Sequence, residues 1–151
     1  MAAVADDVLY SLQVNSDIAP TFNDSYDRVL SRRDAQQDGF FSAFYRHLLD
    51  ASPEAREKFA KTDMNAQVRM LQASVSMLLA FYASGCDNAA LHRVAARHTD
   101  IGPHLYAVWM DCLIDTVRQF DSMFSAEVET AWRAVFSKGV EFMQSYSGAV
   151  L

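Results

Sequence analysis

The sequence predicts an all-α domain, because apolar residues recur at helical spacing along most of the chain and no alternating strand pattern of useful length occurs. The chain has 151 residues, of which 51% are hydrophobic and 21% charged, with five glycines and three prolines. This length and composition are typical of a single soluble globular domain. We expect residues 1–15 to be an N-terminal extension and residues 16–151 to form the domain.

Three helices are predicted in the first part of the chain. Apolar spacing predicts one over 17–30 and a second that begins near Asp34, runs to about 49 and carries Gly39 in its interior. A cap at Ser52 with proline at the next position predicts a short helix that ends near residue 59. Residues 1–15 either form one more short helix or fray, because their pattern is too brief to decide.

Four further helices are predicted in the second part. Capping residues or a Gly-Pro pair mark where each begins. The expected starts are Asp63, Asp87, Gly102–Pro103 and Ser125.

Charge and cysteine usage exclude several classes of function. The net charge of −6 and the pI near 5.0 oppose binding to nucleic acid. No apolar run reaches the length of a membrane span, and residues 1–7 lack the positive charge of a signal peptide, so we expect a cytoplasmic protein without membrane contact. Cys86 and Cys112 lack metal-type spacing and are expected to be reduced thiols.

A lone histidine continues the apolar face of the helix before Gly102. Leu91, Val94 and Ala95 recur at steps of three and four, and His98 follows on the same stripe. A neutral imidazole suits an axial position of haem iron. A histidine on an apolar stripe is more often a hydrogen-bonded core residue, so the stripe alone leaves both interpretations open.

An ordered set of motifs gives this histidine a context. In chain order they are Phe44–Tyr45, Pro53–Glu54, Phe59, Gln67 with Leu71, residues 96–99 around His98, and Tyr106. This set, over about residues 16–146, resembles the globin family, most closely the haem domain of bacterial flavohaemoglobins and their single-domain relatives. The resemblance implies a three-on-three helical sandwich around one haem b.

The resemblance also implies the residues of the haem pocket. His98 would be the proximal iron ligand, with a backbone carbonyl of its own helix as the partner of its N–H. Tyr45 and Gln67 would stabilise a bound gas by hydrogen bonds, although Tyr45 alone reads as a core tyrosine and Gln67 as a surface residue. The further pocket residues implied are Phe59, Leu71, Val94, Arg97, Ile101, Tyr106 and Trp109. His47 and His92 are expected to be solvated, and His104 or Arg97 is a candidate to reach a haem propionate.

Two departures from the family pattern bear on activity. Ser147 stands where the family has a last-helix glutamate that makes the proximal histidine more electron-rich, and no reductase module follows Leu151. We therefore expect reversible binding of O₂, NO and CO by a monomer or homodimer, with NO dioxygenation dependent on a separate reductase. The alternatives are a gas sensor that acts through a separate partner, and a globin-fold interaction module without haem.

Overall fold

The computed structural model describes residues 17–86 and 89–149, with side chains as far as residue 146. The expected N-terminal extension and the expected cap at Asp87 lie outside the described residues. Within them every regular element is a helix, as predicted. The helices are one over residues 17–30, α2 (Phe40–Ala51), α3 (Pro53–Lys58), α4 (Met64–Ser84), α5 (Ala89–Ala96), α6 (Pro103–Phe120) and α7 (Ala126–Ala149).

Three of the predicted helix starts are confirmed by their caps. The Ser52 hydroxyl accepts a hydrogen bond from the Ala55 amide, and the Asp63 carboxylate accepts from the amides of residues 65 and 66. The Ser125 hydroxyl accepts from the Val128 amide. These bonds satisfy amides that have no partner inside the helix, which is why each helix begins where it does.

The predicted start of α2 near Asp34 is wrong. Asp34 Oδ1 accepts hydrogen bonds from the amides of Gln36 and Asp38, and Gln37 has a left-handed backbone, with φ of 66°. An aspartate bonded to nearby amides in this way stabilises a turn in competition with a helix. The helix therefore begins at Phe40, and Gly39 is its N-cap rather than an interior residue.

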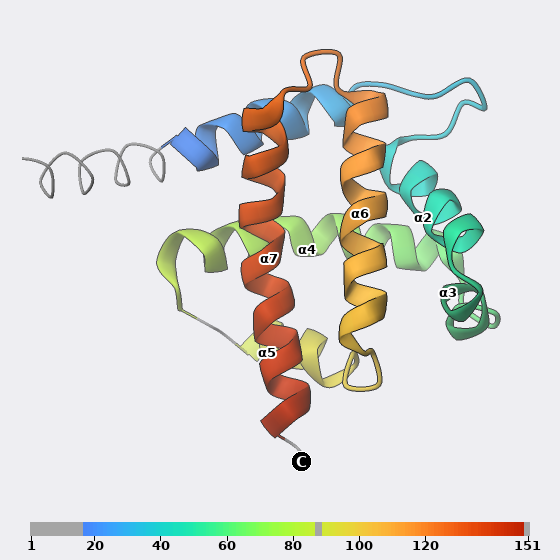
Figure 1. Ribbon diagram of the computed structural model, residues 1–151, viewed down its shortest axis with the longest axis vertical. Helices are drawn as coiled ribbons and strands as arrows, with labels where there is room; N and C mark the ends of the chain where they lie inside the picture. The colour runs from blue at the N-terminus through green and yellow to red at the C-terminus, as the bar shows by residue number, and fades with distance from the viewer. Residues whose placement is uncertain (1–16, 87–88, 150–151) are drawn as a thin grey trace, which may run out of the picture.

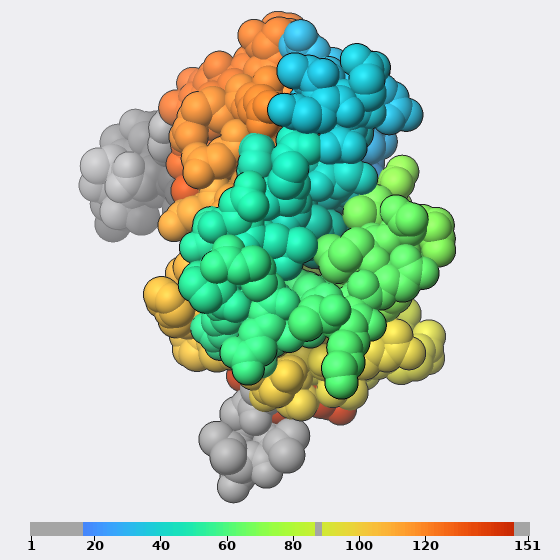
Figure 2. Space-filling view, turned by 90° about the vertical axis from the view of Figure 1, so that its right-hand side faces the viewer, coloured from blue at the N-terminus to red at the C-terminus, as the bar shows by residue number. Residues whose placement is uncertain are grey.

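The helices form the two layers of a three-on-three sandwich. The antiparallel pair α6 and α7 packs side by side with α2 beside α6, and the helix over 17–30, α4 and α5 cross behind them (Figure 1). The face turned toward the viewer in Figure 2 carries α2, α3 and the first part of α4. Among the described helices, none combines the length and apolar character needed to cross a membrane.

A buried polar network joins the helix over 17–30 to the adjoining ends of α6 and α7. Asp121, which is 2% exposed, accepts hydrogen bonds from Ser25 Oγ at 2.6 Å and from Arg28 Nε at 2.6 Å. Trp132 Nε1 donates in turn to Ser25 Oγ at 2.8 Å. Burial acts to raise the pKa of Asp121, but the bonds from Arg28, Ser25 and the Met123 amide outweigh it and lower this pKa.

This network makes Asp121→Asn strongly destabilising. The change is expected to lower the free energy of unfolding by roughly 2–4 kcal/mol, because it removes a buried charge and leaves Arg28 without its partner. Urea denaturation at pH 7 measures the loss. Asp115→Asn is the matched control on α6, because Asp115 and Arg118 form an exposed pair that is worth at most about 1 kcal/mol.

The same variant tests the pH dependence. Because the pKa of Asp121 is lower in the folded protein, the stability that it contributes is present above the unfolded pKa of about 3.9 and is lost as the pH falls through the folded pKa. Asp121→Asn should therefore lose less stability than the parent protein between about pH 5 and pH 2. Identical acid denaturation of the two proteins would contradict the lowered pKa.

Candidate functional site

All the residues expected in the pocket line one cavity of about 330 Å³. A volume of this size falls in the range of small-molecule and cofactor sites, roughly 300–1,000 Å³. The ten predicted residues in its wall are Tyr45, Phe59, Gln67, Leu71, Val94, Arg97, His98, Ile101, Tyr106 and Trp109. They come from α2, α4, α5, α6 and the segments that follow α3 and α5, so the fold brings together side chains far apart in sequence.

His98 projects into the cavity from the turn that follows α5. Its backbone amide bonds to the Ala95 carbonyl, so the residue lies two positions beyond the last helical one rather than inside the helix as predicted. Its Nδ1 lies 2.6 Å from the Val94 carbonyl oxygen. A carbonyl only accepts, so Nδ1 carries the proton and the lone pair of Nε2 remains free for a ligand bond.

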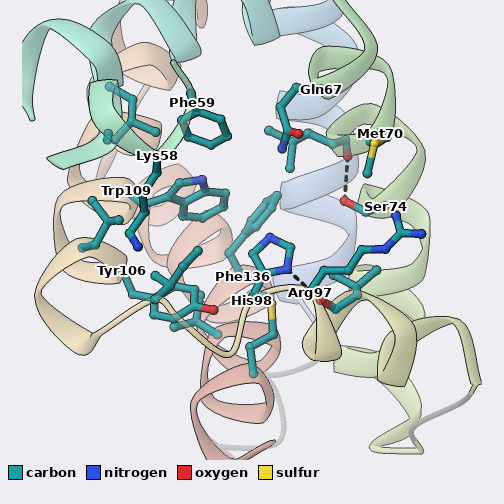
Figure 3. A pocket seen from close by; sticks show the side chains of 18 of the residues that line it. Lys58, Phe59, Gln67, Met70, Ser74, Arg97, His98, Tyr106, Trp109 and Phe136 are labelled. Atoms are coloured by element: carbon teal, nitrogen blue, oxygen red, sulfur yellow. Dashed lines mark hydrogen bonds between the residues drawn. The ribbon is translucent and has the colours of Figure 1, made fainter. Parts of the chain in front are cut away.

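The opposite side of the cavity carries the predicted polar pair. In Figure 3, Phe59 and Gln67 lie across the open space from His98. Gln67 Nε2 donates to Tyr45 Oη at 3.1 Å, and Tyr45 is 4% exposed. This bond uses the tyrosine oxygen as acceptor, so the Tyr45 O–H proton remains available to a guest in the cavity.

The pKa of Tyr45 determines whether its hydroxyl can donate a hydrogen bond. Burial raises its pKa to about 12, and the hydrogen bond from Gln67 offsets part of that rise. The phenol is therefore neutral at physiological pH. The Tyr45 ring packs edge-on against Phe59 at 5.8 Å between centroids.

Tyr106 places a second hydroxyl in the cavity wall beside His98 (Figure 3). The residue is 6% exposed, and its Oη has no hydrogen-bond partner among the described residues. Burial, with a smaller effect of the nearby Asp100 carboxylate, raises its pKa to about 12. A buried hydroxyl without a partner is costly, so a polar group on a bound molecule would stabilise it.

Charged side chains line part of the cavity as well. Lys58 Nζ contacts the Asp100 carbonyl at 3.2 Å and its carboxylate at 3.3 Å, which joins α3 to the turn that carries His98. The exposed Arg97 lies on the other side of His98 from Tyr106 (Figure 3). Lys58 and Arg97 could each pair with an acidic substituent of a bound molecule.

The donor set fits a cofactor that brings most of its own metal ligands. In the described part of the chain, no group of three His, Cys, Asp or Glu side chains could hold a metal ion. One imidazole is too few ligands for an ion alone, but it suffices for iron already held in the plane of a porphyrin. The apolar wall, the free Nε2 of His98 and the unpartnered Tyr106 hydroxyl together fit haem.

Several wall residues were missed by the sequence prediction. Met70 and Ser74 follow Gln67 at helical spacing on α4, and Phe136 of α7 also lines the cavity. Continuing the i, i+3, i+7 series from Gln67 would have found the first two. Lys58 carries no such signal, because its place depends on how α3 packs.

The other histidines lie outside the cavity. His47 is only half-exposed and its Nδ1 lies 3.0 Å from Thr116 Oγ1, so the expectation that it is solvated is wrong. It reaches α6 because α2 packs against that helix. The exposed His92 packs edge-on against the Phe142 and Tyr146 rings, and the exposed His104 is not part of the cavity wall.

Comparisons with known proteins agree with this geometry. The Globin family model matches residues 42–143, which is more than half of the chain. A crystal structure of a protein from Pseudomonas aeruginosa PAO1, described as structurally highly homologous to a human hemoglobin, matches with 36% identity and a TM-score of 0.77. The match covers 85% of this chain and 97% of that one. No curated protein matches. The chain belongs to the globin family and is similar to a bacterial protein of the same fold.

Proposed function

We propose that this chain binds haem b through His98 and reversibly binds O₂, with NO and CO as alternative ligands. The observation that carries the proposal is the pairing across one cavity of a free imidazole Nε2 with a neutral phenol donor. When bound, haem supplies a ferrous iron to which a diatomic gas can add. Membership of the globin family, whose members typically bind haem, supports the same assignment.

Different residues of the chain would have different roles in haem binding. His98 would supply the nitrogen that holds the iron, and the Val94 carbonyl fixes the orientation and tautomer of its ring. Phe59, Leu71 and Trp109 offer apolar surface that excludes water from the cavity. Arg97, Lys58 and Tyr106 provide cations and a hydroxyl suited to the carboxylates of the cofactor.

Tyr45 and Gln67 would favour a ligand with partial negative charge. In a cavity of low dielectric constant, the Tyr45 O–H donates to such an atom, and the amide of Gln67 holds the phenol oxygen in place. Because O₂ would carry more negative charge than CO in such a site, the pair would favour O₂ over CO.

Replacement of His98 tests the axial ligand. His98→Ala is expected to lose most of its haem on purification and to recover binding when imidazole is supplied, because the cavity then lacks its one metal-ligating nitrogen. The absorption spectra of the ferric, ferrous and CO-bound states measure this. His104→Ala is the matched control, because His104 lies outside the cavity wall. Full haem occupancy in His98→Ala would refute the assignment, and a parent protein that takes up no haem would favour the haem-free interaction module.

Replacement of Tyr45 tests the donor. Tyr45→Phe is expected to raise the O₂ dissociation rate by roughly 10- to 100-fold and the CO rate much less, because a hydrogen bond to a partly charged acceptor is worth about 1.5–3 kcal/mol. Flash photolysis and stopped-flow mixing give the rates. Gln67→Leu should have a smaller effect that does not add to that of Tyr45→Phe, since the two side chains share one hydrogen bond. Equal effects on both gases would show altered packing instead.

NO dioxygenation is a second candidate, favoured by the Tyr45 donor that Gln67 holds on the side of the cavity opposite His98. The reaction O₂ + NO + e⁻ → NO₃⁻ consumes one electron. That electron would come from the reduced cofactor in a single turnover, and continued turnover would need a reductase to supply further electrons.

A single-turnover experiment separates this activity from simple binding. When the reduced, O₂-loaded protein is mixed with NO in a stopped-flow instrument, about one nitrate per protein is expected, with further nitrate only after a reductase is added. A slow reaction or the absence of nitrate would rule out NO dioxygenation. The remaining candidate functions would then be O₂ storage and gas sensing through a separate partner protein.

A further inference from the structure

Gly139 lies in the interior of α7 at a close contact with α4. The residue is buried, and a Cβ added to it would lie 2.3 Å from Leu78 Cδ2 and 3.6 Å from Leu78 Cγ. Non-bonded carbon atoms prefer a separation of about 3.5–4.0 Å, so no larger residue fits while Leu78 keeps its position. Glycine is less favourable than alanine inside a helix, and the contact with Leu78 explains its presence there.

Leu78 is part of the cavity wall, although its side chain is almost completely buried from solvent. It is 5% exposed, and Val140 and Phe136 of α7 line the cavity on the same side. Its neighbours Val75 and Phe81 are buried in the core. The close-packed side chains of the core have little room to move. A displaced Leu78 side chain would therefore turn toward the empty space beside it, which is the cavity.

We propose that Gly139 is a positioning residue that sets the size of the occupant admitted between α4 and α7. It acts through Leu78, whose side chain can lie against α7 and not extend into the cavity only because position 139 has no side chain. The inference rests on the proposed binding of haem. The Leu78 side of the cavity is apolar and would face apolar substituents of the cofactor, whereas the acidic ones suit Lys58 and Arg97.

Haem loss from the loaded protein tests this role. Gly139→Ala should accelerate transfer of haem to an excess of a haem-free acceptor globin by about ten-fold or more, in line with the usual cost of overpacking. Adding Leu78→Ala to this variant should restore the slower rate, because the shortened side chain leaves room for the new methyl group. Gly39→Ala is the matched control, since a Cβ at that glycine meets nothing within 4 Å, and its rate should equal that of the parent.

A smaller cofactor separates a narrowed cavity from general loosening of the helices. Deuterohaem carries hydrogen in place of the two vinyl groups of haem b, so it needs less room at its apolar edge. Gly139→Ala should accelerate its loss by no more than about three-fold, because less of the cofactor meets the displaced side chain. Equal acceleration for both cofactors, or an unchanged rate for haem b, would overturn the proposal.

A separate readout keeps the two proposals distinguishable. If the purified protein takes up no haem, the proposed function fails. The anionic aromatic dye 1-anilinonaphthalene-8-sulfonate, whose rings bind in apolar cavities, can then report on the cavity of that same protein. Weaker dye binding in Gly139→Ala, restored by Leu78→Ala, would support the role of Gly139. Unchanged dye binding in Gly139→Ala would overturn it.

Discussion

The buried carboxylate of Asp121 fixes the framework on which the cavity is built. It lies at the C-terminal end of α6 and accepts hydrogen bonds from Ser25 and Arg28 of the helix over 17–30. Ser25 in turn accepts a hydrogen bond from Trp132 of α7. The long helices α6 and α7 are thereby held together at the end remote from His98. The cavity wall includes Tyr106 and Trp109 of α6 and Phe136 and Val140 of α7. Trp132 of the network stacks on Phe136, with 5.8 Å between ring centroids, so the network supports the cavity wall through this aromatic contact.

Local chemistry explains why the helices could be predicted from the sequence. The caps at Ser52, Asp63 and Ser125 bond to amides within three residues along the chain. The local sequence is therefore enough to predict where these helices begin. The start of α2 could not be read in this way. Asp34 is held by Arg46, twelve residues later, and that ion pair favours a turn over a longer helix.

The candidate site shows the same division between local and distant causes. Helical spacing predicted that His98 points the same way as Leu91 and Val94, although it lies in the turn after α5. The resemblance carried by the ordered motifs supplied the remaining candidates. The hydrogen bond from Gln67 to Tyr45 joins helices 22 residues apart, and the contact between Leu78 and Gly139 depends on how α4 meets α7. Such pairings depend on how the helices pack against one another. The periodicity of apolar residues within one segment does not predict that packing.

The place of His98 in a turn has a mechanical consequence. Because α5 ends at Ala96, the imidazole is carried by a short tether of 3₁₀ character, with the amides of Arg97 and His98 bonded to carbonyls three residues earlier. A small rotation of this tether would move the imidazole ring within the cavity without breaking a hydrogen bond inside α5. The depth at which His98 Nε2 stands in the cavity can then change while the helical frame stays rigid.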